Sequence, residues 1–228
     1  MLRIFTFCLA TILSSTLAST LASALASANQ SDRLTAPAFS ADKDRCHSAD
    51  PGFLCLGIKY VTFTGGAAIT EEQSRQTVRE TNRLWAQCQI GFQIDEFLAV
   101  SSHELGIRSR IGDYTELDDV RSAFADEHRL LVAVTGRWDR SGSLGDTAAN
   151  AWTSMPGGPP YGAILEQSVG TFSNIVAHEL GHYLNLYHLN DSADLMNPTI
   201  YSTSRKLTSG QCEIARQTVA SNWRGMLR

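Results

Sequence analysis

Residues 178–188 have the sequence HELGHYLNLYH and constrain the fold of this chain more than any other segment. On a helix, His178 and His182 lie on one face, one turn apart, so that both imidazoles can point at the same metal ion. Glu179 is rotated by about 100° from His178, which leaves its carboxylate beside such an ion without forcing it to coordinate. The spacing therefore predicts a helix that carries two metal ligands and one nearby carboxylate.

His188 cannot join these ligands on a continuous helix. Six residues past His182 correspond to about 600° of rotation, which leaves His188 about 120° away from the ligand face. Asn185 is the residue at which the chain can turn, because Asn adopts the left-handed conformation more readily than most residues other than Gly. We therefore expect the helix to end near Leu184 and the reversal to bring His188 back as the third ligand.

Three imidazoles and one carboxylate are the components of a hydrolytic zinc site. A fourth position left open for water and substrate distinguishes a catalytic zinc from a structural one. Bound zinc lowers the pKa of water toward ~7, and a nearby carboxylate can accept the proton. We expect one catalytic Zn²⁺ held by His178, His182 and His188, with Glu179 as the general base. A purely structural zinc site would have no use for that carboxylate.

The motif resembles the signature of the metzincin zinc endopeptidases, in which H-E-x-x-H-x-x-G-x-x-H precedes a Met-containing turn. Met196 lies where that Met-turn belongs, and Asn185 replaces the usual Gly. The resemblance implies an α/β (α+β) catalytic domain: a twisted mixed sheet with an antiparallel edge strand, two long helices and a C-terminal helix. Matrixin-like and pappalysin-like subfamilies both stay open. Similarity in outline also covers residues 147–152, 156–158, 162–165 and 206–211.

The resemblance further implies a peptide substrate bound as an extended strand along the edge strand. The residues expected to contact it there are Ala148, Ala149, Asn150 and Ala151. Residues 198–201, after the Met-turn, would line the pocket for the side chain that follows the cleaved bond. Tyr201 is a candidate for stabilising an oxyanion, although it lies further from Met196 than a metzincin tyrosine would, and an ordinary packed Tyr is the alternative.

Two rival interpretations remain from the sequence. In a thermolysin-like protease the third ligand is a Glu on a later helix, and Glu213 is the only Glu that follows Glu179. In the second rival, the chain is a secreted binding protein that uses a protease-like fold without turnover. Glu179 and the open fourth position argue against this binding protein.

The N-terminal residues have the pattern of an export signal. Arg3 precedes a short apolar run, and an A-x-A-like site ends at Ala28. We assign residues 1–28 to a signal peptide, with cleavage after Ala24 or Ala26 as the alternatives. We assign residues 29–45 to a mobile leader or short prosegment, and residues 46–228 to the zinc metalloprotease domain. The apolar run is too short to span a bilayer comfortably, and no second long apolar stretch follows. The mature chain is therefore expected to be secreted, extracellular or periplasmic.

Four cysteines remain after removal of Cys8 with the signal, and an even number in an exported chain predicts two disulfides. Three pairings are open, and we favour one short bridge and one long bridge. Cys46 is also the one candidate for a prosegment thiol that keeps a protease latent on its zinc. The favoured pairs are Cys46–Cys55 and Cys88–Cys212.

Alternating and apolar runs predict strands at residues 58–63, 91–97 and 129–134, and capping boxes predict helices that begin after Thr70 and Thr208. Thr171 is the expected N-cap of the ligand helix. A net charge of −4 without a basic stripe argues against nucleic acid as a partner. Asp-containing loops are the only candidates for Ca²⁺, and none has a strong calcium pattern. We expect a monomer.

Overall fold

A computed structural model describes residue 46, residues 50–65 and residues 68–228. The expected signal peptide at residues 1–28 and leader at residues 29–45 lie outside these described residues. No helix in the described ranges is long and apolar enough to cross a bilayer.

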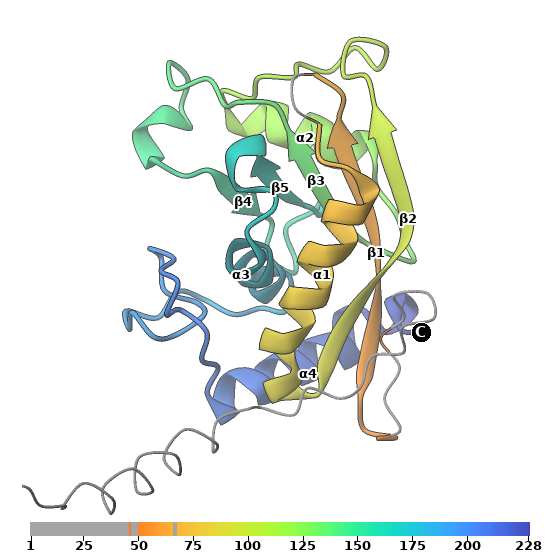
Figure 1. Ribbon diagram of the computed structural model, residues 1–228, viewed down its shortest axis with the longest axis vertical. Helices are drawn as coiled ribbons and strands as arrows, with labels where there is room; N and C mark the ends of the chain where they lie inside the picture. Colours follow the sequence, from red (N-terminus) through yellow and green to blue (C-terminus); the bar gives the residue numbers. More distant parts are fainter. Residues whose placement is uncertain (1–45, 47–49, 66–67) are drawn as a thin grey trace, which may run out of the picture. The chain divides into compact units, whose positions relative to one another are not determined.

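Within the described residues, five strands form one mixed sheet in the order β2-β1-β3-β5-β4 (Figure 1). The first four strands in this order run parallel, and β4 pairs antiparallel with β5 at one edge. This is the α/β class with an antiparallel edge strand that the sequence predicted. The strands are β1 Leu54–Phe63, β2 Ile90–Val100, β3 Leu130–Thr135, β4 Ala151–Thr153 and β5 Ala163–Glu166.

In the same described part of the chain, four α-helices accompany the sheet, and two of them begin with the predicted capping boxes. Thr70 and Thr208 each accept a hydrogen bond from the third helical residue, whose Gln side chain bonds back to the cap amide. The α-helices are α1 Glu71–Trp85, α2 Tyr114–Ala123, α3 Ser173–Tyr183 and α4 Ser209–Asn222. Short 3₁₀ turns are η1 Ala86–Cys88, η2 Gly145–Thr147, η3 Gln167–Val169 and η4 Arg224–Met226.

Successive strand residues point to opposite faces of the sheet, and this alternation builds two apolar clusters. On β1, Ile58 and Tyr60 belong to the cluster that includes residues of α1, α3 and α4. Val61 and Phe63 belong to the cluster on the other face, which includes residues of α2. The ligand helix α3 is therefore packed within the larger cluster, beside α1 and against the β4–β5 part of the sheet (Figure 1).

Both favoured disulfides are present. Cys46 pairs with Cys55 on β1, with 5.5 Å between their Cα atoms. Cys88, at the end of η1, pairs with Cys212 on α4, with 4.8 Å between Cα atoms. Because the sulfur of Cys46 forms this disulfide, it is not a free thiol that could bind zinc. The alternative of a latency thiol at this position is therefore wrong for this structure. The longer bridge fixes the start of α4 against the end of the α1–η1 segment.

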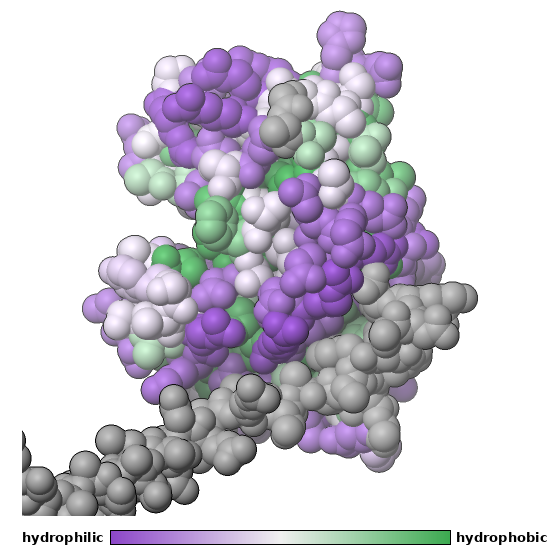
Figure 2. All heavy atoms as spheres, viewed as in Figure 1, coloured by the Kyte–Doolittle hydropathy of each residue, from purple (hydrophilic) through white to green (hydrophobic). Residues whose placement is uncertain are grey.

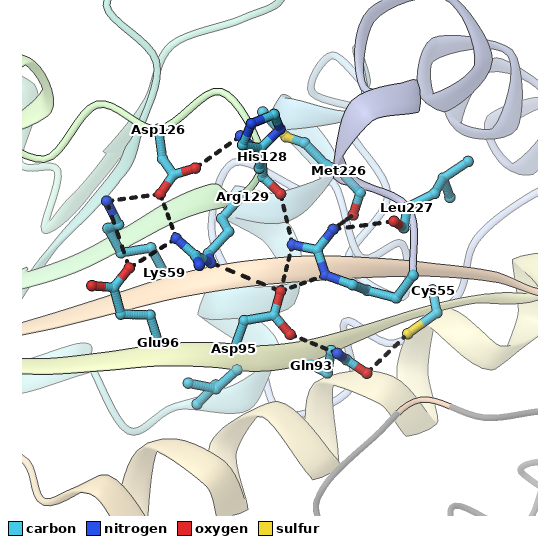
Figure 3. Close-up of polar contacts among 12 residues, drawn as sticks. Cys55, Lys59, Gln93, Asp95, Glu96, Asp126, His128, Arg129, Met226 and Leu227 are labelled. Carbon is cyan, nitrogen blue, oxygen red and sulfur yellow. Dashed lines mark hydrogen bonds and ion pairs between the residues drawn. The ribbon is translucent and has the colours of Figure 1, made fainter.

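A charged cluster on the β1–β2 side of the sheet anchors the chain's last residue (Figure 3). The Asp126 carboxylate accepts from Lys59 and from Arg129, each at 2.8 Å. Asp95 pairs with Arg228 at 2.5 Å, and the Arg228 backbone amide donates to the Cys55 carbonyl at 2.9 Å. The C-terminal residue is thereby fixed to the sheet, on the β1–β2 side and away from the β4 edge.

Candidate active site

Helix α3 carries the first two predicted ligands and packs against α1. The Trp85 indole N–H of α1 donates to the Ala177 carbonyl at 3.1 Å, one residue before His178. The predicted N-cap was wrong: α3 begins after Phe172, not after Thr171, and Phe172 offers no side-chain cap. The Thr81 hydroxyl of α1 donates to the Ser173 backbone carbonyl at 3.2 Å, so the start of α3 is held by α1.

The helix ends where the sequence predicted, and the turn is a Schellman motif. Asn185 has φ 64°, the left-handed conformation expected at this position. Its amide donates to the His182 carbonyl at 3.0 Å, and the Leu186 amide donates to the Gly181 carbonyl at 2.9 Å. The reversal returns the chain toward the ligand face and places His188 beside the two helical imidazoles.

The three imidazoles converge through their Nε2 atoms. Nε2 of His178 lies 3.1 Å from Nε2 of His182 and 3.3 Å from Nε2 of His188. Nδ1 of His178 lies 2.8 Å from the Leu195 carbonyl, and Nδ1 of His182 lies 2.8 Å from the Leu186 carbonyl. A carbonyl only accepts hydrogen bonds, so Nδ1 must carry the proton and Nε2 must offer its lone pair.

The donor set fits a zinc ion of the catalytic type. Burial lowers the pKa of His178 to about 3, with His182 adding to the effect, and lowers the pKa of His182 to about 4. Burial also lowers the pKa of His188. At neutral pH all three are therefore neutral ligands. Within the described part of the chain, these histidines are the one set of three or more His, Cys or carboxylate side chains whose ligand atoms lie close enough to share an ion. Three ligands leave the fourth position of a tetrahedral zinc open.

Met196 lies under α3, as the resemblance implied. It is fully buried, and a Cβ built on Gly181 would overlap its sulfur. The Asp194 carboxylate accepts from the Met196 amide at 2.7 Å and from the Gln211 side chain at 2.9 Å. The turn is thus tied to the capping box of α4. It also presents the Leu195 carbonyl to His178, so the turn beneath the site orients one of the ligands.

Glu179 is buried beside the ligands and is hydrogen-bonded to the edge strand. The Thr153 hydroxyl of β4 donates to Oε2 of Glu179 at 2.6 Å. Burial raises the pKa of Glu179 to about 7, against the opposing effects of the Thr153 hydrogen bond and the Arg121 charge. Neither Thr153 nor Arg121 was predicted from the sequence, because both approach Glu179 from segments far away in the chain.

An open cleft of about 740 Å³ gives access to Glu179 and the three histidines. Figure 2 shows a hollow on the left side of this face, between the region of β4 and the segment that follows α3. All four predicted substrate contacts line the cleft, although only Ala151 belongs to β4, and Ala148 is left-handed with φ 54°. The other wall contains Pro198, Thr199 and Ile200.

Two candidates from the sequence lie apart from this arrangement. Tyr201 is 48% exposed and is not among the residues that line the cleft. Glu213 is an exposed residue of α4 that accepts a hydrogen bond from Gln217, and it is not part of the histidine group. Neither the tyrosine role nor the thermolysin-like ligand set is favoured by the geometry.

A family model agrees with the motif, and two solved structures are similar to this chain. The family model described as matrixin matches residues 57–214. Metalloproteinase-II from Bacteroides fragilis is a similar solved structure, with 16% identity, a TM-score of 0.45, and coverage of 72% of this chain and 53% of that one. Archaemetzincin from Methanopyrus kandleri has 14% identity, a TM-score of 0.49, and coverage of 75% and 99%. The chain spans about half the length of the Bacteroides protein. No curated protein matches.

Proposed function

Because the chain belongs to the matrixin family, we propose that it is a zinc-dependent endopeptidase that hydrolyses peptide bonds with Glu179 as its general base. The observation that carries this proposal is the convergence of three Nε2 atoms next to a buried carboxylate in an open cleft. A structural zinc site would have neither the unused fourth position nor the adjacent carboxylate.

His178, His182 and His188 would hold one zinc ion through Nε2. When bound, zinc supplies Lewis-acid chemistry, which polarises a carbonyl and makes water more acidic. The carbonyls of Leu195 and Leu186 hold the first two imidazoles in the tautomer that leaves Nε2 free. The protein thereby prepares both helical ligands before any ion arrives.

Glu179 accepts a proton from the attacking water and delivers it to the nitrogen that leaves. A general base works best when its pKa is close to the working pH, and burial raises the pKa of Glu179 to about 7. The cleft around it gives the peptide and water access to this carboxylate.

The peptide substrate binds as an extended strand along the free edge of β4, with Ala151 in the strand and Ala148, Ala149 and Asn150 beside it. Strand addition to an edge supplies main-chain hydrogen bonds that do not depend on the substrate's sequence. Residues 198–200 line the opposite wall and would contact the side chain that follows the cleaved bond.

We also propose that the protein is exported and acts as a monomer. Residues 1–28 would be the signal, residues 29–45 the leader, and residues 46–228 the protease. The two disulfides support an oxidising compartment, where such bridges persist.

Peptide-library cleavage by the zinc-loaded protein, with and without a chelator, tests the proposal. We expect cleavage that the chelator abolishes and zinc restores. Glu179→Gln should retain zinc and lose activity by at least about a hundredfold, as expected for loss of a general base. His188→Ala should lose zinc, and Glu213→Ala, the control, should keep both zinc and activity.

Three results would contradict the proposal. Full activity of Glu179→Gln would remove the general base. Loss of zinc in Glu213→Ala alone would replace the ligand set with the thermolysin-like one. Zinc-loaded protein that binds peptides but cleaves none would identify a binding protein on a protease fold.

A further inference from the structure

We propose that Thr153 is the positioning residue for Glu179, and that it joins the general base to the strand on which the peptide docks. The inference rests on the proposed function of the same site. Thr153 belongs to β4, 26 residues before Glu179 in the chain, and its role does not follow from the metal-binding motif.

The hydrogen bond between the two side chains is short and shielded from solvent. Oγ1 of Thr153 lies 2.6 Å from Oε2 of Glu179, and the two residues are 9% and 5% exposed. A hydroxyl that donates to an ionised carboxylate makes one of the stronger hydrogen bonds in proteins. It engages one carboxylate oxygen and fixes the rotation of the group. Among the described residues the carboxylate makes this one hydrogen bond, through Oε2, and Oε1 is left for water in the cleft that Glu179 lines.

Alternation along β4 explains why Thr153 and no neighbouring residue makes this bond. Side chains of a strand point to opposite faces in turn, so Ala151 and Thr153 share one face and Trp152 lies on the other. Ala151 packs against the apolar cluster that contains α3, whereas Trp152 packs on Tyr114 of α2. Thr153 is the polar residue of β4 on the face toward α3.

The same alternation directs the backbone of Thr153 to the free edge of the sheet. The Asn150 carbonyl accepts from the Glu166 amide at 2.8 Å, so Asn150 and Trp152 direct their backbone groups toward β5. Ala151 and Thr153 then direct theirs to the open edge. The side chain that holds the base and the backbone available to a peptide strand therefore belong to one residue.

A buried arginine fixes this part of β4. Arg121 of α2 donates through Nε to the Gly162 carbonyl at 3.0 Å and through Nη2 to the Trp152 carbonyl at 2.9 Å. It is 4% exposed, so water competes little for these bonds. Arg121 thereby connects the Trp152 carbonyl, directly before Thr153, to the Gly162 carbonyl, directly before β5. The anchor of Glu179 is thus attached to the sheet and does not depend on a loop.

Thr153→Val tests this role, because it keeps the shape of the side chain and removes only the hydroxyl. We expect kcat of the zinc-loaded full chain to fall about ten- to hundredfold, the effect of one hydrogen bond to a charged group. KM and zinc content should change less than about twofold. Thr153→Ser keeps a donor and should restore most of kcat.

Two controls separate positioning from a structural effect. Thr62→Val removes the hydroxyl of a buried residue of β1, which donates to the Ile69 carbonyl and makes no bond to Glu179. This variant should leave kcat unchanged. In a Glu179→Gln background, Thr153→Val should cause no further loss, because Thr153 acts through the carboxylate. Such non-additivity is the expected signature of residues that act as a unit.

Wild-type kcat in Thr153→Val, equal losses in Thr153→Val and Thr62→Val, or a further loss in the Glu179→Gln background would each overturn the inference. Crystal structures of the wild type and Thr153→Val provide a readout without activity, since the Glu179 carboxylate should rotate only in the variant. An unchanged Glu179 would also overturn the inference. A wild type that cleaves no peptide would refute the proposed function, and the Glu179 conformers would still decide the role of Thr153.

Discussion

Gly181 lies between the two helical ligands, and its replacement by Ala tests how tightly the Met-turn is packed under the site. A Cβ at this position would overlap the Met196 sulfur, lie 3.0 Å from its Cε, and lie 3.6 Å from the Trp85 ring. Met196 is fully buried, so its side chain has little room to withdraw. Packing against Met196, and not an unusual backbone conformation, therefore favours glycine at this position.

Two opposing effects set the expected change in stability. Replacing a helical Gly by Ala gains about 0.5–1 kcal/mol from backbone entropy. Inserting a methyl group into a packed core costs about 1–3 kcal/mol. The packing cost exceeds the entropic gain, so we expect Gly181→Ala to lose about 1 kcal/mol of the free energy of unfolding. For a domain of this size the melting temperature should fall by about 2–4 °C.

Zinc affinity should fall in the same variant. Displacing Met196 also moves Leu195, whose carbonyl orients His178. Loss of a group that orients a metal ligand costs about 10- to 100-fold in affinity. Chelator competition measures this affinity, and urea unfolding of the metal-free protein measures the stability.

Gly210→Ala is the matched control for Gly181→Ala. Gly210 lies in the first turn of α4, and a Cβ built on it meets no atom within 4 Å. The control should gain stability from the higher helix propensity of Ala and leave zinc affinity unchanged, so the difference between the variants isolates the steric overlap. If Gly181→Ala is as stable as Gly210→Ala and binds zinc equally well, the reasoning about Met196 is refuted.

The remaining predictions concern the turn, the charged cluster and the long disulfide. Asn185→Ala should cost about 1 kcal/mol of stability by urea unfolding and Asn185→Gly close to none, because the residue has φ 64°; equal losses would contradict this. Burial opposes the charge of Asp126, but hydrogen bonds led by Lys59 outweigh it and lower the pKa from 3.8 to about 2. Ionised Asp126 therefore stabilises the fold by up to about 2 kcal/mol above pH 4, and the wild type should lose this stabilisation as the pH falls toward 2. Asp126→Asn has no carboxylate to titrate at this position, so its free energy of unfolding should not show this loss. Parallel pH profiles of unfolding for the two proteins would refute the assignment. Replacing Cys88 and Cys212, which are 124 residues apart, by Ala should cost about 3–5 kcal/mol by denaturant titration, and an unchanged midpoint would show that the bridge adds nothing.

The sequence predicted those elements of the fold that are specified locally. The capping boxes at Thr70 and Thr208, the end of α3 at Asn185 and the buried strand β3 depend on neighbouring residues or on simple alternation. The N-cap of α3 was predicted wrongly, because the helix begins one residue later, where the Thr81 hydroxyl of α1 donates to the Ser173 carbonyl. Contacts with another helix here outweigh the local preference of Thr for the N-cap position.

The candidate site likewise contains residues that the sequence predicted and residues that it did not. Ligand spacing identified His178, His182 and His188, because helix rotation and one turn determine where they lie. Thr153 and Arg121 were missed, since their approach to Glu179 depends on how α2, β4 and α3 pack together. The edge strand was expected near residues 148–151 and is found at Ala151–Thr153, because η2 extends to Thr147 and Ala148 ends it in a left-handed conformation.

The orientation of the metal-binding groups depends on segments outside the ligand helix. The Met-turn supplies the Leu195 carbonyl to His178, and the Schellman turn supplies the Leu186 carbonyl to His182. An isolated peptide of the motif would have the same spacing but no Met-turn beneath it. Because these bonds form only when the domain is folded, zinc should bind the folded chain far more tightly than the unfolded chain. By mass action, zinc must then raise the free energy of unfolding, and the increase should grow with the logarithm of its concentration.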